Sequence, residues 1–229
     1  ARTEFNALGF RGPVPPMPKG REVRIIMLGG SAAFIGYPLE RSIAGHLERI
    51  FRERDRPEVK VYNWGAFSFV SGQELSLLVR DVADRDPDLV IVYDGANDVV
   101  EPFAYEPRPG YPYQYFVHEE GLRRVSGRAG ARSLLASLLW KSRALRATFR
   151  PALEAAVVDL HALRAEAGYR TPAWEMEIVT HYLRNVERMA AVARAFRFRL
   201  LVCLQPMAIF KEIRQPGERR HLGAQDFRD

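Results

Sequence analysis

Runs of apolar residues alternate along the chain with segments in which apolar positions recur every three or four residues. The strand-like runs occupy residues 24–28, 59–64, 88–93 and 198–204, and the helix-like periodicity occupies residues 39–51, 72–83 and 175–196. Strands that alternate with helices predict a parallel sheet with helices on both faces. Right-handed crossovers between the strands then favour a three-layer α/β/α sandwich with a doubly wound sheet.

One long segment, residues 99–171, interrupts this alternation and exceeds the length of a simple connection. Its first part, EPFAYEPRPGYPYQYF, is rich in proline and tyrosine and is predicted not to form regular helix. Its second part, around SLLASLLWKSRALRATF, predicts a strongly apolar helix with basic residues. We interpret residues 99–171 as an insertion, a cap or lid, within one domain that spans residues 1–229.

The apolar helix of the insertion has two interpretations. Packing on the domain is favoured, because one stripe of the helix would face a core through Leu134, Leu135, Leu138, Leu139 and Trp140. Contact with a membrane surface or a protein partner stays open as the alternative.

Composition narrows the class of protein. The chain has 229 residues, 47% of them hydrophobic and 27% charged, which is typical of a globular domain. The formal net charge of +6 could attract nucleic acid, but the arginines are scattered and not interleaved with aromatics, so we expect no nucleic-acid partner. The single cysteine, Cys203, lies in an apolar run and is expected to be a small core residue.

Three of the predicted strands end in small and polar residues. The first ends in GGS with Ser31, the second in NWGAFS with Gly65, and the third in YDGAND with Gly95, Asn97 and Asp98. Ligands of open parallel sheets gather at the carboxyl ends of the strands. With the strand order 2-1-3-4, these residues would converge, and we expect the Ser31 hydroxyl within about 8 Å of the Asn97 side chain.

These residue types suit acyl transfer. Gly29 and Gly30 allow a sharp turn, after which a helix would direct its first N–H groups toward the Ser31 hydroxyl. Ser31 would attack an ester carbonyl, and the N–H groups of Ser31 and Gly65 and the amide of Asn97 would stabilise the oxyanion. Such donors are worth roughly 3 to 4 kcal/mol each in hydrolases. We expect residues 103–116 to border the mouth of this site or a partner surface, because irregular backbone is hard to satisfy inside a core.

A different class of function also fits part of the pattern. Gly29 and Gly30 before a helix could cradle a phosphate, as in a nucleotide-binding module. Neither G-x-G-x-x-G nor G-x-x-x-x-G-K-[ST] is present, which weakens this alternative. The carboxylates and histidines lack the spacing of metal ligands, so no metal and no organic cofactor is expected.

Taken in order, the blocks LGGS, NWG and DGAND resemble the SGNH hydrolase superfamily of GDSL-like esterases and lipases. The segments NALGFRGP and YLRNVERMAAVARAFRFRLLVCLQP are similar to envelope-associated bacterial members, so the resemblance spans residues 6–206. It implies a flavodoxin-like fold, a Ser31 nucleophile, and an oxyanion hole and site shaped by Gly29, Gly30, Gly65, Gly95, Asn97 and Asp98. It also implies an ester substrate, either a small molecule or an acylated carbohydrate or lipid, and a periplasmic or cell-envelope location.

Two features depart from that family. Its commonest first block has an acidic residue where this sequence has Gly30. Its general base comes from an Asp-x-x-His block after a fifth strand, and no such spacing occurs here. The five histidines are interpreted as surface or packing residues: His46, His118, His161, His181 and His221.

The absent block has a consequence for the function. We expect the chain to be C-terminally incomplete, with the Asp and His encoded in a longer reading frame. Without them Ser31 would lack an activating base. A degenerate hydrolase fold that serves as an accessory or binding subunit of a larger, membrane-associated assembly is therefore the alternative.

Overall fold

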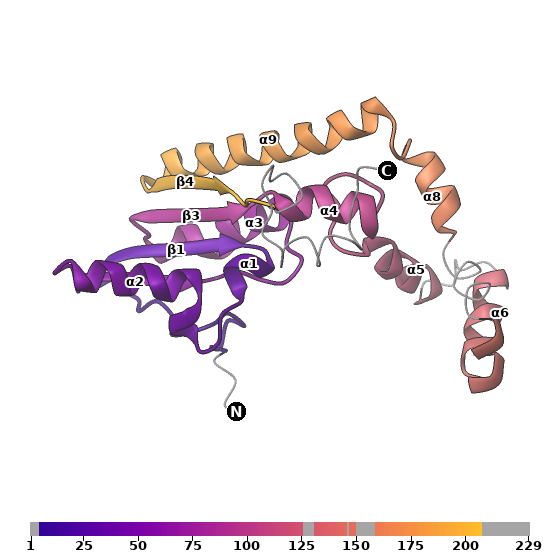
Figure 1. The fold of residues 1–229 in the computed structure, drawn as a ribbon, viewed down its shortest axis with the longest axis horizontal. Helices are drawn as coiled ribbons and strands as arrows, with labels where there is room; N and C mark the ends of the chain where they lie inside the picture. Colours follow the sequence, from indigo (N-terminus) through magenta and orange to yellow (C-terminus); the bar gives the residue numbers. More distant parts are fainter. Residues whose placement is uncertain (1–4, 126–130, 146, 150–158, 208–229) are drawn as a thin grey trace, which may run out of the picture.

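The described strands form one parallel sheet, which lies between helices toward one end of the molecule (Figure 1). The computed structural model describes residues 5–125, 131–145, 147–149 and 159–207. The strands are β1 (Val23–Gly29), β2 (Val59–Asn63), β3 (Leu89–Asp94) and β4 (Arg199–Leu204). Their order is β2-β1-β3-β4 and each neighbouring pair is parallel, which confirms the predicted topology.

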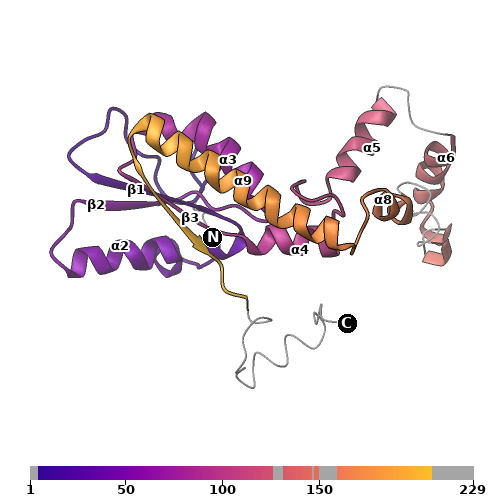
Figure 2. The same ribbon diagram turned by 90° about the horizontal axis from the view of Figure 1, so that it is seen from above.

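Helices cover both faces of the sheet. Helix α2 (Ile43–Glu53) lies on one face, and α3 (Ser71–Leu77) and α9 (Pro172–Phe196) lie on the other (Figure 2). Side chains alternate along β1, so that Ile26 joins the core under α3 and α9 while Ile25 joins the core under α2. The predicted three-layer α/β/α sandwich is confirmed.

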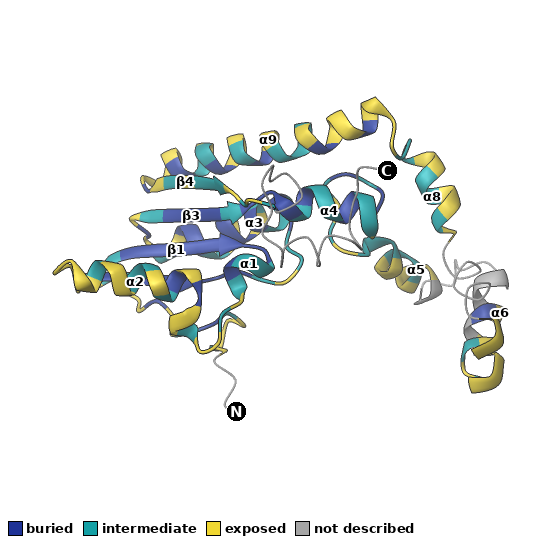
Figure 3. Ribbon diagram, in the orientation of Figure 1, coloured by how far each residue is buried: buried dark blue, intermediate teal, exposed yellow. Residues whose placement is uncertain are grey.

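Short helical elements complete the connections: α1 (Ser31–Phe34), η1 (Leu39–Arg41), η2 (Leu78–Val82), η3 (Ala83–Arg85), α4 (Ala96–Ala104), α5 (Tyr115–Val125), α6 (Ala131–Trp140) and α8 (Leu160–Glu166). The helix predicted over residues 72–83 is thus divided into α3, a π-helical turn and a 3-10 turn. Figure 3 shows β1 and β3 largely buried, whereas α9 presents buried and exposed residues in alternation. In the described residues no helix combines the length and apolarity needed to cross a bilayer.

The first part of the insertion is more ordered and more buried than predicted. Helix α4 continues through Pro102 to Ala104, because a proline close to the C-terminal end of a helix removes only one backbone hydrogen bond. Glu106, Pro107 and Pro109 are buried, so the expectation that residues 103–116 avoid the interior is wrong for these three.

The polar groups of Glu106 and Pro107 tolerate burial because they have hydrogen-bond partners. The indole Nε1–H of Trp174 donates to the carbonyl oxygen of Pro107 at 2.6 Å. The carboxylate of Glu106 accepts from the N–H of Phe116 and from the guanidinium of Arg108. Irregular backbone is therefore satisfied here by side chains from α9 and from the insertion itself.

The stripe predicted to face a core from α6 is not covered by the described part of the chain. Leu135, Leu138 and Leu139 are exposed, whereas the small Ala136 is buried. The prediction of ordinary packing is wrong for these three leucines, since α6 lies away from the sheet (Figure 1) and, among its described side chains, the buried one is Ala136.

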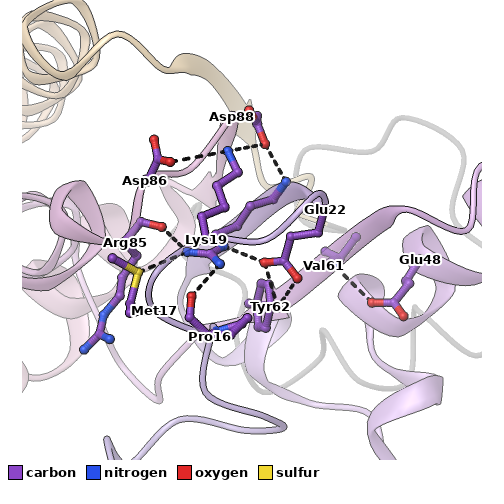
Figure 4. Close-up of polar contacts among 11 residues, drawn as sticks. Pro16, Met17, Lys19, Glu22, Glu48, Val61, Tyr62, Arg85, Asp86 and Asp88 are labelled. Atoms are coloured by element: carbon purple, nitrogen blue, oxygen red, sulfur yellow. Dashed lines mark hydrogen bonds and ion pairs between the residues drawn. The ribbon is translucent and has the colours of Figure 1, made fainter.

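A buried arginine near the amino end of β1 anchors the N-terminal segment. Figure 4 shows its partners Pro16, Glu22 and Arg85. Arg24 is fully buried, and its guanidinium donates to Glu22 at 2.7 Å, to the Pro16 carbonyl at 2.8 Å and to the Arg85 carbonyl. The Tyr62 hydroxyl donates to the same Glu22 carboxylate at 3.1 Å. A buried guanidinium with this many acceptors is fixed in place, so it holds the segment before β1 against the sheet.

Candidate functional site

Ser31 lies at the carboxyl end of β1, where the strand turns directly into a helix. Gly30 is the N-cap of α1, and its carbonyl accepts from the N–H groups of Ala33 and Phe34, both at 3.1 Å. Ser31 is the first residue of the helix, so its N–H has no acceptor within the helix. A half-buried hydroxyl and an N–H without a helical partner are therefore presented together by one residue.

Asn97 packs against the residue that precedes Ser31. It lies in the first turn of α4, whose N-cap is Gly95 with a φ of 99°, a conformation that glycine adopts without strain. The Asn97 Nδ2 donates to the Phe69 carbonyl at 2.7 Å, and a Cβ on Gly30 would overlap this nitrogen. Because an amide nitrogen has two hydrogens, one donor is used to hold the side chain and one is left for a ligand.

Gly65 packs against α1 from the loop after β2. A Cβ on Gly65 would lie 2.7 Å from the Phe34 nitrogen and 2.9 Å from the Ala33 Cβ, so any side chain here would displace the helix. The N–H of Gly65 donates to the Asn63 Oδ1 at 3.0 Å. An oxyanion would have to share this donor, and the role of Gly65 in an oxyanion hole stays a prediction.

Asn63 is a site residue that sequence reasoning missed. It is buried at the end of β2, where its Oδ1 accepts from Gly65 and its Nδ2 donates to the Ala33 carbonyl at 2.8 Å. The side chain thereby ties the loop after β2 to α1. The available signal was a polar residue at the end of an otherwise buried strand, two positions before the glycine.

Asp98 points into the protein and connects three helices. Its carboxylate accepts from the N–H of Ser71 at 3.0 Å and from the Ser71 hydroxyl, and Asn185 donates its Nδ2 to that hydroxyl at 2.9 Å. The residues come from α4, α3 and α9 in turn. These bonds fix the start of α4, on which Asn97 lies, and the site-shaping role of Asp98 stays a prediction.

Further acidic side chains are buried beside Asp98. Burial raises the pKa of Glu74 well above its ordinary value and raises the pKa of Asp94 to about 7. Burial also raises the pKa of Asp98, against the lowering effect of the Ser71 hydrogen bonds. The nearby charge of Asp94 raises the pKa of Glu74 further. Within the part of the chain that the structure describes, no group of three His, Cys, Asp or Glu side chains is arranged to hold a metal ion.

Glu101 is a second residue that the sequence did not single out. It lies one turn after Asn97 on the same face of α4 and is buried. Burial raises its pKa to about 7, although a hydrogen bond from Ser68 acts in the opposite direction. A carboxyl that changes charge near neutral pH is thus placed close to the candidate site.

The described histidines lie on helices: His46 on α2, His118 on α5, His161 on α8 and His181 on α9. The ring of His46 contacts Arg49 at 3.2 Å, and that of His181 lies 3.5 Å from Glu177. Among these residues no histidine ring hydrogen-bonds to the Ser31 hydroxyl. His221 lies outside the described residues.

Comparison with known proteins adds the following. No protein-family model and no curated protein matches the chain. Similar solved structures include the psychrotrophic esterase EstA from Pseudoalteromonas sp., which is 16% identical over 86% of each chain with a TM-score of 0.37. The lipase/acylhydrolase from Enterococcus faecalis is 21% identical over 77% of this chain and 74% of that chain, with a TM-score of 0.31.

The same comparison includes AlinE4, described as an SGNH-hydrolase family esterase, which is 19% identical over 78% of this chain and 75% of that chain, with a TM-score of 0.31. Identities this low assign no activity to this chain.

Proposed function

We propose that this chain is a serine ester hydrolase of the SGNH type, with Ser31 as its nucleophile. One observation carries the proposal: the ends of three strands meet around Ser31. The Asn97 amide after β3 lies against Gly30 and donates to Phe69 in the loop after β2, while Gly65 in that same loop packs on α1. The proposed nucleophile, two candidate oxyanion donors and a rigid support thus share one edge of the sheet.

The reaction follows from this arrangement. The Ser31 hydroxyl oxygen attacks the ester carbonyl carbon while a base takes the hydroxyl proton. The oxyanion of the tetrahedral intermediate accepts hydrogen bonds from the Ser31 N–H and from the free donor of the Asn97 amide. Collapse of the intermediate expels the alcohol, which receives the proton, and leaves an acyl group on Ser31. Water then attacks the acyl group by the same route.

The base is the part of this mechanism that the described residues do not supply. By the sequence resemblance, we propose that it is a histidine of an Asp-x-x-His block, a spacing that the printed sequence does not contain. A serine without a base keeps only substrate binding and oxyanion stabilisation, so most of the rate would be lost. Acyl groups of the cell envelope as substrates, and an envelope location, stay predictions of the sequence resemblance.

The test compares two chain lengths with and without Ser31. The 229-residue chain should hydrolyse p-nitrophenyl acetate little faster than its Ser31→Ala variant, and a longer chain ending in Asp-x-x-His should lose its activity on that substitution. Ser31-dependent turnover by the short chain would show that it already contains a base, and His221 would be substituted next. A long chain that is indifferent to Ser31→Ala would contradict the hydrolase proposal.

An accessory or binding subunit is the second candidate function. The observation that favours it is the exposed face of α6, where Leu135, Leu138 and Leu139 precede the basic Lys141 and Arg143. An apolar face flanked by cations suits an anionic membrane surface. Co-sedimentation with vesicles that contain phosphatidylglycerol should be lost in a Leu135→Ser/Leu138→Ser variant. Equal sedimentation of the variant and the parent chain would contradict this function.

A further inference from the structure

Three phenylalanine rings form a continuous aromatic surface next to Ser31. The rings of Phe5 and Phe34 stack with centroids 5.9 Å apart, and those of Phe34 and Phe67 lie 4.3 Å apart. We call Phe5, Phe34 and Phe67 the aromatic triplet. The residues come from the N-terminal segment, from α1 and from the loop after β2, so the contact depends on the fold and not on sequence proximity.

The position of the triplet relative to Ser31 is fixed by short connections. Phe34 is three residues after Ser31 in the single turn of α1, which places both side chains on the same side of the helix. Phe67 is two residues after Gly65, whose backbone packs directly against Ala33 and Phe34. The triplet therefore adjoins the point at which an ester carbonyl would be attacked.

Large apolar side chains of the aromatic triplet and its neighbours are exposed to solvent. Phe5 is 50% exposed and Phe67 is 62% exposed, and the neighbouring Ile35 and Tyr37 are also exposed. Contiguous exposed apolar surface of this kind costs free energy in water and commonly marks a binding site. Its position beside Ser31 indicates that the occupant is a part of the substrate.

The surface is also held rigidly. Arg11 is buried, and its Nη1 donates to the carbonyl oxygens of Phe34 and Gly36 at 2.8 and 2.6 Å. Its guanidinium lies 5.5 Å from the centre of the Phe34 ring. A ring that is already fixed loses little conformational entropy when a ligand packs on it.

We propose that the aromatic triplet is the subsite for an apolar chain of the ester, and that the preferred substrate carries an acyl or alkyl group of about four carbons or more. The assignment to a substrate subsite rests on the proposed function. The rings are inclined to one another by 28° and 48°, so they do not form a flat platform for a sugar ring. Phenylalanine rings also offer no hydrogen bonds to hydroxyl groups, whereas a flexible chain adapts to inclined rings.

The experiment measures equilibrium binding of p-nitrophenyl acetate, butyrate and octanoate to the Ser31→Ala chain by dialysis. The dissociation constant should fall by about twofold for each added methylene, because each is partly removed from water. A Phe34→Ala/Phe67→Ala variant should bind the three esters within about threefold of one another, with little change for the acetate. Phe67→Leu should keep most of the chain-length dependence, because leucine preserves apolar area.

Phe196→Ala is the matched control, since this ring is 52% exposed at the end of α9 next to the start of β4. It should leave the chain-length dependence intact. Equal binding of all three esters by the Ser31→Ala chain, or a dependence that survives Phe67→Ala and Phe34→Ala, would overturn the proposal. If the Phe34→Ala variant does not fold, the chain-length dependence of binding is compared between the Phe67→Ala and Phe67→Leu variants. The proposal expects it to be lost only in Phe67→Ala.

This outcome can be separated from failure of the proposed function. If hydrolysis does not need Ser31 but binding still depends on chain length through Phe67, the proposed Ser31 hydrolase is contradicted. The proposal of an apolar binding surface then remains supported. If hydrolysis needs Ser31 but binding does not depend on the length of the acyl chain, the subsite proposal is overturned. The hydrolase proposal then remains supported.

Discussion

The side-chain amide of Asn97 donates to the Phe69 carbonyl at 2.7 Å and occupies the space that a Cβ on Gly30 would need. This contact joins the loops after β1, β2 and β3 through one side chain. It also explains why glycine stands directly before Ser31, at the position where the resembling family has an acidic residue. A side chain on residue 30 and the present position of the Asn97 amide exclude each other.

Gly30→Ala should therefore damage the site through Asn97. The new methyl group would push the amide away from Phe69, and we expect a loss of about 1 to 3 kcal/mol in the free energy of unfolding. Urea denaturation measures this loss. Gly20→Ala is the control, because a Cβ there meets no atom within 4 Å and the backbone is not in the left-handed region. Equal stability of the two variants would show that Asn97 accommodates the methyl group.

Asn97→Ala should lower turnover more than it lowers stability. In a chain length that shows Ser31-dependent hydrolysis, kcat should fall about 10²- to 10³-fold, as for loss of an oxyanion donor, and KM should change little. Urea denaturation of the same variant separates this effect from the loss of the bond to Phe69. A KM that rises while kcat stays constant would assign Asn97 to ground-state binding instead.

The sheet and the positions of its strand ends could be predicted because short-range signals agree with each other. The apolar run of β3 and the glycines after β1 locate strand ends, and residues at the carboxyl ends of adjacent parallel strands must lie near one another. Ser71 and Asn185 could not be predicted, because their importance lies in contacts across the fold. Asn185 is 114 residues from Ser71, and nothing in its own helix distinguishes it from a solvated asparagine.

The insertion was predicted least well, for a related reason. Proline and tyrosine indicate irregular backbone, but they do not show which partner satisfies it. The Pro107 carbonyl is buried because Trp174, in another helix, donates to it. The leucine spacing of α6 predicts an apolar face, and it contains no information about whether anything covers Leu135 and Leu138.

The Glu74→Gln variant should be more stable than the wild type at alkaline pH. Burial raises the pKa of Glu74 and brings that of Asp94 to about 7, so between about pH 4 and pH 7 the folded chain binds more protons than the unfolded chain. The stabilisation that Glu74 and Asp94 provide is complete at pH values below the pKa values of the unfolded chain. It is lost as the pH rises through the pKa values of the folded chain. The wild-type free energy of unfolding should therefore fall from about pH 5 to about pH 8.

Glutamine cannot ionise, so the Glu74→Gln variant should gain roughly 1 to 3 kcal/mol over the wild type near pH 8 and little near pH 5. Urea denaturation at both pH values measures the difference. Glu187→Gln, on the exposed face of α9, is the control and should not change the pH dependence. A pH dependence unchanged by Glu74→Gln would mean that Glu74 is not the group that couples protons to folding.

Arg24→Lys should be strongly destabilising even though lysine keeps the positive charge. The fully buried guanidinium donates to Glu22, Pro16 and Arg85 at once, and an ammonium group cannot reproduce this planar set of donors. Acceptors left unpaired in the interior retain their cost of desolvation, so we expect a loss of about 3 to 5 kcal/mol. Arg49→Lys is the matched control: its bond to Glu53 is solvent-exposed and should contribute less than about 1 kcal/mol. If urea denaturation gives similar losses for both variants, water must reach the Arg24 site and satisfy its acceptors, and the N-terminal segment cannot be anchored by that side chain.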